Sequence, residues 1–315
     1  MKRKMLNVPK GGYDGMKGFT IVEFLVAGLL SVIVLIAVVS SYFTSRKLND
    51  AANERLAIQQ DLRNAATLIV RDARMAGSFG CFNMSEHIEQ DVVSDVTQKK
   101  PLFSLKRNST RNSTNKLIPI AESSNIGYQG FTQRLNALIF QYGIDDANAS
   151  AETTVVSSCG AISKPGKQIP TLEDAKKELK IQDSDKEQNG NIARQRHVVN
   201  AYAVGRFGNN EEGLFRFQLD DKGEWGNPQL LAKKVKRMDV RYIYVSGCPE
   251  DEDAGKEEQF KYTGKFDSSV TPAGVEVLLD SGSDAKIVAS SDNIIYAYRI
   301  NATIRGGNVC ANRTL

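Results

Sequence analysis

The sequence has little of what most enzymes and metal proteins need. It contains only two histidines, His87 and His197, and its four cysteines form no Cys-x-x-Cys pair. A structural zinc site is therefore not expected. No Gly-x-Ser-x-Gly or other nucleophile motif accompanies His197, for which we expect a surface position. The acidic run at residues 250–253 lacks the alternating ligands and central glycine of a helix–loop–helix calcium site, so a solvated loop is expected there. We predict a protein that is not an enzyme and has no metal and no cofactor.

An excess of charge of one sign is missing from most of the chain. Five of the 41 basic residues and one of the 37 acidic residues lie in the first 18 positions. The rest of the chain has 36 of each and is electrically neutral. Proteins that bind nucleic acid neutralise phosphates with basic surfaces. Direct binding to nucleic acid is therefore not expected.

Charge and proline are both absent from residues 24–39. With its flanks, this apolar segment covers residues 19–43, which are 25 residues. As a helix it would be about 37 Å long, enough to cross a hydrocarbon core of about 30 Å. The basic residues precede it, so the N-terminus should stay in the cytoplasm and the rest should be exported. The segment is too long for an ordinary secretory signal, and hydropathy alone favours an uncleaved signal anchor.

The cysteines agree with export. They are Cys81, Cys159, Cys248 and Cys310. An even number of cysteines fits two disulfides in an oxidising compartment. Four cysteines allow three connectivities, and the sequence alone does not choose among them.

One acidic residue interrupts the apolar segment. A carboxylate such as Glu23 costs about 2.5–3.5 kcal/mol within a membrane-spanning helix, so it usually has a partner. The residues up to it read Lys17-Gly18-Phe19-Thr20-Ile21-Val22-Glu23. This string resembles the prepilin processing site of type IV pilins and their relatives.

The resemblance implies a defined maturation. In that family an inner-membrane aspartic peptidase cuts after the glycine and methylates the new N-terminal amine. Carried over, residues 1–18 are the leader peptide, the cut falls between Gly18 and Phe19, and Phe19 becomes N-methylphenylalanine. Glu23 would neutralise the new ammonium on its own or a neighbouring subunit, and so guide docking during assembly.

The helix is expected to continue beyond the membrane. Residues 44–76 contain neither proline nor glycine. Apolar residues recur at helical spacing along one face: Ile58, Leu62, Ala65, Ile69, Ala73 and Ala76. We therefore predict one helix over residues 19–76, with a transmembrane half at 19–43 and an amphipathic periplasmic half at 44–76. In pilins the second half packs on a globular sheet domain.

Residues 77–315 are expected to form a β-rich periplasmic domain. Gly77 and Gly80 suit the end of the helix and the turn after it. Residues 83–135 read as loops with short strands. We predict a helix at 172–179 capped by Thr171, a hairpin turn at Lys222-Gly223, and strands at 137–144, 198–207, 213–219, 238–245, 275–279, 286–289 and 294–304. The expected class is α+β and pilin-like, with a long N-terminal helix packed on a mainly antiparallel sheet.

Three further stretches narrow the resemblance. Residues 71–81, 230–242 and 297–305 resemble the pattern of the PilW family of minor pilins, called PilJ in some bacteria, in its Neisseria type. The resemblance covers the first 82 residues well and the later strands in patches, whereas residues 83–200 align with no motif. Pilins commonly fasten their C-terminal region with a disulfide. This favours a bond between Cys248 and Cys310, which follow predicted strands, and leaves Cys81 with Cys159.

The family implies a role in type IV pilus assembly. Its members join other minor pilins in a complex that primes the filament, and a globular domain of more than 200 residues suits the filament tip. The expected partners are other minor pilins, the major pilin, the prepilin peptidase and the inner-membrane assembly platform. The expected location is the inner membrane, with a single pass, and then the extracellular pilus.

Other functional classes stay open. The nearest alternative is a minor pseudopilin of a type II secretion system, because the processing site does not separate the two. A signal-anchored periplasmic adhesin or sensor would require an uncut N-terminus.

Overall fold

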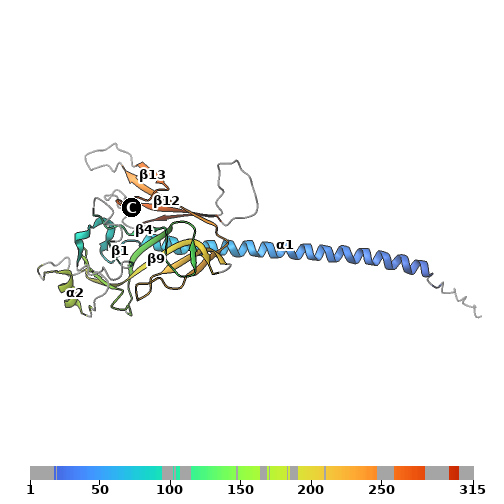
Figure 1. The fold of residues 1–315 in the computed structure, drawn as a ribbon, viewed down its shortest axis with the longest axis horizontal. Coiled ribbons are helices and arrows are strands. Elements are labelled where there is room, and N and C mark those ends of the chain that lie inside the picture. The colour runs from blue at the N-terminus through green and yellow to red at the C-terminus, as the bar shows by residue number, and fades with distance from the viewer. Residues whose placement is uncertain are drawn as a thin grey trace, which may run out of the picture. The chain divides into compact units, whose positions relative to one another are not determined.

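The computed structural model of the 315-residue chain describes residues 18, 20–93, 102, 104–106, 115–146, 148–163, 169, 171–182, 184, 191–208, 211–246, 259–280 and 298–304 (Figure 1). Phe19, Cys248, Cys310, the acidic run at 250–253 and the strand expected at 286–289 lie outside these ranges. The chain divides into two compact units, Met1–Ala57 and Ile58–Leu315.

Helix α1 (Ile21–Met75) contributes residues to both units. Its 55 residues begin two positions later and end one position earlier than the helix expected from the sequence. Gly77 follows with φ +83°, a conformation that suits glycine and ends a helix. The Gly77 amide then donates to the carbonyl of Gln141, 2.9 Å away, which fixes the helix end to a strand of the globular unit.

The segment after the helix is short and irregular. Strands β1 (Ser78–Phe79) and β2 (Phe82–Asn83) form a small hairpin. Gly80 lies between them with φ +67°. The 3₁₀ turns η1 (Met84–Glu86) and η2 (Glu89–Asp91) lead to strand β3 (Val92–Val93).

Within the described residues, the larger of two main sheets has nine strands, and we call it the large sheet. Its centre is β9 (Ala193–Phe207), which pairs with four other members. Among the described strand pairs of the large sheet, β3 and β8 are parallel and all the others are antiparallel. The remaining strands are β4 (Ile120–Ser123), β5 (Phe131–Gln133), β6 (Ala137–Ile144), β7 (Thr154–Ser157), β8 (Ile162–Ser163), β10 (Glu211–Gln218) and β11 (Gln229–Lys233).

The second main sheet, which we call the small sheet, is antiparallel throughout. Its described strands follow the order β13-β12-β14-β15. They are β12 (Arg237–Ser246), β13 (Gln259–Thr263), β14 (Gly274–Asp280) and β15 (Tyr298–Thr303).

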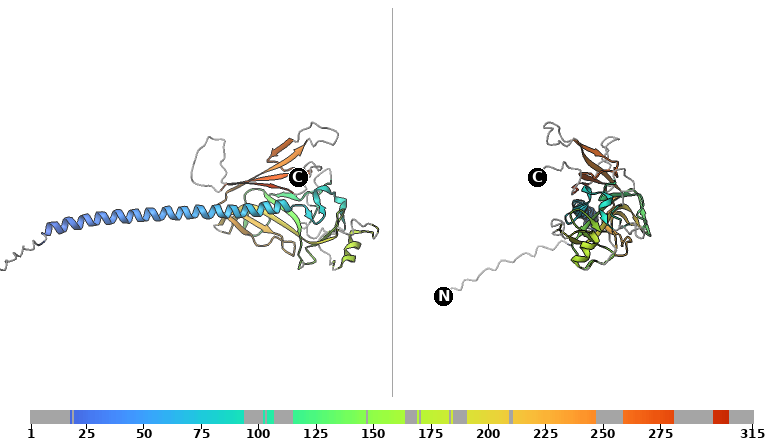
Figure 2. Two further views of the ribbon diagram at one scale, coloured as in Figure 1. Left: turned by 180° about the vertical axis from the view of Figure 1, so that it is seen from behind. Right: turned by 90° about the vertical axis from the view of Figure 1, so that its left-hand side faces the viewer.

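The apolar stripe of α1 forms part of the principal core of the second unit. Leu62, Ala65, Ile69 and Ala73 are all at most 2% exposed. They share one cluster with inward residues of both main sheets, including Phe140 and Tyr202 of the large sheet and Tyr242, Val277 and Ile300 of the small sheet. The figures show this part of α1 running alongside the strands (Figure 2). The helical spacing thus predicted the buried face, and the chain has the α+β composition expected.

Other local predictions hold in part. Helix α2 (Leu172–Leu179) has the expected bounds, and the Thr171 hydroxyl accepts a hydrogen bond from the Asp174 amide at 3.1 Å. β6 also has the expected bounds. The turn at Lys222-Gly223 exists, with Gly223 at φ +80°, but it leads from β10 to β11, a strand that the sequence reading missed. β7, β8 and β13 were also missed.

Candidate functional site

The most unusual surface of the molecule is the N-terminal part of α1. Its apolar side chains are open to the surroundings; for example, Ile21 is 81% and Leu35 is 64% exposed. The helix is long and apolar enough to cross a membrane, and none of its most apolar window is buried in the structure. Exposed apolar surfaces of this size mark sites of contact with a membrane or with another protein.

Two hydroxyl groups in this part of the helix have acceptors within the helix. Ser31 donates to the carbonyl of Ala27 at 2.7 Å, and Thr44 donates to that of Ser40 at 2.9 Å. Because these donors already have acceptors, they do not oppose transfer of the segment to an apolar medium.

Glu23 is the only charged residue between Lys17 and Arg46. Its Oε2 accepts hydrogen bonds from the amide and the hydroxyl of Thr20, each at 3.0 Å. In return, the Glu23 amide donates to the Thr20 hydroxyl at 3.3 Å. This reciprocal pair is a capping box at the start of α1, and it satisfies amides that the first helical turn leaves free.

The predicted processing residues therefore lie at the beginning of an exposed apolar helix. Gly18 is exposed and precedes the capping residue Thr20 by two positions. The capping box gives Glu23 a structural role that the sequence reading missed. The signal was present, because Thr-x-x-Glu before an apolar run is the pattern of a capping box.

A second group of polar residues lies where α1 packs on the large sheet. Asp72 is fully buried. Its Oδ1 accepts from the Tyr142 hydroxyl at 2.9 Å. Its Oδ2 accepts from the Tyr202 hydroxyl at 2.6 Å and from the Asn200 side chain at 2.8 Å. These three partners come from the neighbouring strands β6 and β9, so one helix carboxylate ties together two strands.

Two arginines compensate the charge of Asp72. Arg71 donates to Oδ1 through Nε at 3.1 Å and Nη2 at 2.9 Å. Arg216 of β10 places Nη2 3.5 Å from Oδ2. A buried carboxylate is tolerated only with such partners. Burial, followed by the charge of Asp72, raises the pKa of Tyr142 to about 12, and the pKa of Tyr202 is raised by the same causes. Both hydroxyls therefore stay protonated at neutral pH and act as donors.

The sequence reading missed this Asp72 network and was wrong about His197. His197 is 2% exposed and lies in β9, with Nε2 3.3 Å from Oε1 of Gln141 and its ring 5.5 Å from the ring of Phe79. Strand alternation explains the error. Arg194 and Arg196 point outward, so Gln195 and His197 point inward.

The structure contains a disulfide between Cys81 and Cys159, with Cα atoms 4.7 Å apart. It joins the turn after α1 to the segment between β7 and β8. The Ser157 hydroxyl, which donates to the carbonyl of Phe79 at 2.7 Å, supports the same junction. Among the described residues, no group of three or more histidine, cysteine or acidic side chains could hold a metal ion.

The chain was compared with protein families, curated proteins and solved structures. No family model, curated protein or solved structure matches the chain with significant similarity.

Proposed function

We propose that this protein is a minor pilin that takes part in assembling a type IV pilus. It is cut between Gly18 and Phe19, held in the inner membrane by the first part of α1, and then incorporated in a priming complex at the filament tip. The observation that supports this most is the exposed apolar helix with a single carboxylate, Glu23, beside its start. A membrane anchor would use that carboxylate only to cap its helix, whereas subunits that pack through their first helices also need it as the counter-charge of the new ammonium.

The geometry at Glu23 suits such packing. The carboxylate is exposed, and its partners in the structure belong to the adjacent Thr20. After cleavage, the new ammonium at Phe19 would lie next to the same capping box. The carboxylate can therefore neutralise an ammonium of its own chain or of a neighbouring subunit while both lie in an apolar surrounding.

The proposal predicts a processed N-terminus. The protein recovered from membranes should begin at methylated Phe19 in cells that contain the prepilin peptidase, and at Met1 in cells that lack it. Intact-protein mass spectrometry of both samples measures this. A start at Met1 in both samples would leave a signal-anchored periplasmic protein and remove the pilin proposal.

Processing alone does not separate a pilus from a secretion pseudopilus. Deletion of the gene should remove surface pili and leave secreted enzymes at normal levels. The opposite pattern would assign the protein to a type II secretion system instead.

Glu23→Ala should leave cleavage intact and remove most surface pili, because the ammonium loses its counter-charge. Electron microscopy of surface pili and the N-terminal mass measure the two effects. Thr20→Ala is the matched control, since it weakens the same capping box but keeps the carboxylate. Equal loss of pili in both variants would show that helix capping, and not the charge, is the function of Glu23.

A further inference from the structure

Among the described strands, β13 lies at one end of the small sheet. Within the described residues it pairs only with β12, along all five of its positions. Two of its aromatic side chains, Phe260 and Tyr262, are each 58% exposed. Proteins usually protect such edges, because unpaired backbone groups recruit further strands. The aromatic rings of this edge offer apolar contacts to a strand from elsewhere.

The register of β13 separates its side chains onto two faces. Lys261 lies opposite Tyr244 and Thr263 lies opposite Tyr242, so both face the side of the sheet that bears the core. Phe260 and Tyr262 face the other side, because successive strand residues alternate. The edge therefore has a cationic face and an aromatic face.

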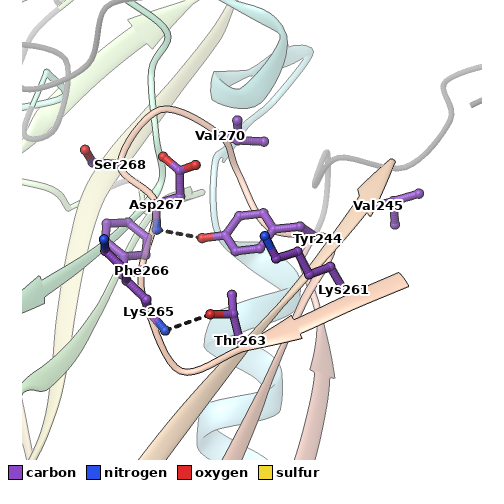
Figure 3. A pocket seen from close by; sticks show the side chains of 9 residues that line it. All are labelled: Tyr244, Val245, Lys261, Thr263, Lys265, Phe266, Asp267, Ser268 and Val270. Carbon is purple, nitrogen blue, oxygen red and sulfur yellow. Dashed lines mark hydrogen bonds between the residues drawn. The ribbon is translucent and has the colours of Figure 1, made fainter. Parts of the chain in front are cut away.

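The cationic face opens into a hollow of 560 Å³ (Figure 3). Its floor includes the rings of Tyr244 and Phe266, and the ring of Phe266 packs 5.1 Å from that of Tyr242. The loop after β13 is held in place by hydrogen bonds at both ends. The Lys265 amide donates to the Thr263 hydroxyl at 3.1 Å, and the Asp267 amide donates to the Tyr244 hydroxyl at 2.8 Å. These hydrogen bonds fix the loop that forms one wall of the hollow.

The hollow carries an excess of positive charge. Lys261 and Lys265 line it, and both interact electrostatically with the carboxylate of Asp267. Asp267 also lines it, but its Oδ1 already accepts from the amide and the hydroxyl of Ser269, at 2.8 and 2.6 Å. Two ammonium groups and one carboxylate give the hollow a net positive charge, which favours binding of an anionic group.

Pairing with a second copy of the strand is disfavoured. A symmetric antiparallel pair of two β13 strands would centre on the middle residue and place Lys261 opposite Lys261. Like charges directly opposite one another destabilise a strand pair. A lysine on an edge strand is a common means of preventing such self-association.

We propose that the edge of β13 opposite β12, which pairs with no other described strand, binds an extended segment of a partner protein as an additional strand. The segment carries an acidic side chain opposite Lys261, over the hollow, and apolar side chains on either side of it that contact Phe260 and Tyr262. Backbone hydrogen bonds along the edge supply affinity, and the alternating acidic and apolar side chains supply selectivity. This surface does not depend on the proposed role in a pilus.

The test uses the full-length chain in detergent micelles and a cyclised β-hairpin peptide whose free strand reads Thr-Val-Glu-Val-Thr. Cyclisation fixes the strand in its bound conformation. The labelled peptide should bind saturably by fluorescence anisotropy and should slow amide hydrogen exchange in β13. Lys261→Glu should weaken binding by about tenfold, because it replaces attraction by repulsion. A peptide with lysine at the central position should bind Lys261→Glu and restore the affinity.

Lys222→Glu is the matched control, because Lys222 is exposed on the turn between β10 and β11 and should not alter binding. Phe260→Ser combined with Tyr262→Ser should also weaken binding, since it removes the apolar face. The proposal is wrong if the peptide does not bind at millimolar concentration, if it protects another strand, or if Lys261→Glu and Lys222→Glu have the same effect.

Discussion

At the scale of single residues, Asp72 places a fully buried carboxylate in the globular unit. A buried carboxylate loses its hydration on folding, and only close partners offset that cost. Here two tyrosines, one asparagine and two arginines surround it. The carboxylate lies on the same side of α1 as the buried Ile69 and Ala73, so its partners decide the position of the helix on the sheet.

Asp72→Asn should lower the free energy of unfolding by about 3–5 kcal/mol, because an amide group meets donors that need an anionic acceptor. Urea unfolding of the full-length chain in micelles, followed by the fluorescence of the single tryptophan, Trp225, measures this. Asp50→Asn is the control, since Asp50 is exposed on the same helix, and it should change stability by less than about 0.5 kcal/mol. Similar stability of the two variants would mean that the Asp72 network contributes little.

At the scale of elements, the sequence predicts what local periodicity controls. The stripe from Ile58 to Ala76 recurs every three or four residues, so the buried face of α1 follows directly from it. β6 is a long apolar run with all but its last residue buried, and its bounds were equally clear. The capping residue of α2, Thr171, precedes its helix in the expected way.

Two of the missed strands, β8 and β13, lack such a signal. β8 has two residues, and β13 reads Gln-Phe-Lys-Tyr-Thr with four of its five residues exposed. An edge strand without a buried face resembles a loop in its sequence, since only its pairing with β12 makes it a strand. The prediction for His197 was wrong for a different reason: its charged neighbours were read as a surface segment, although Gln195 and all residues from His197 to Gly205 are buried in β9.

The candidate sites also differ in whether their residues are close together in the sequence. Gly18, Phe19 and Glu23 belong to one short motif, so a sequence reading can propose them without a structure, and their processing stays a prediction. The partners of Asp72 lie 70, 128 and 130 positions away along the chain, at Tyr142, Asn200 and Tyr202. Their meeting depends on the register between β6 and β9 and on how α1 lies across both, which no local pattern encodes.

At the scale of the whole globular unit, the Cys81–Cys159 bond closes a long covalent loop. It spans 78 positions and joins the turn between β1 and β2 to the connection between β7 and β8. A bond of this span restricts the unfolded chain more than the folded one. Replacing both cysteines by serine should therefore lower the free energy of unfolding by about 2–5 kcal/mol. Urea unfolding under oxidising conditions measures the loss.

The single variants provide the internal control for this bond. Cys81→Ser or Cys159→Ser alone already breaks it, so each should be as unstable as the double variant within about 0.5 kcal/mol. If the two single losses instead add up in the double variant, the two cysteines act independently and are not bonded to each other. Because Cys81 follows α1 so closely, loss of the bond should also speed amide hydrogen exchange in the β1–β2 hairpin before it affects β9. Uniform faster exchange across the sheet would show that the bond stabilises the whole unit and not the junction with the helix.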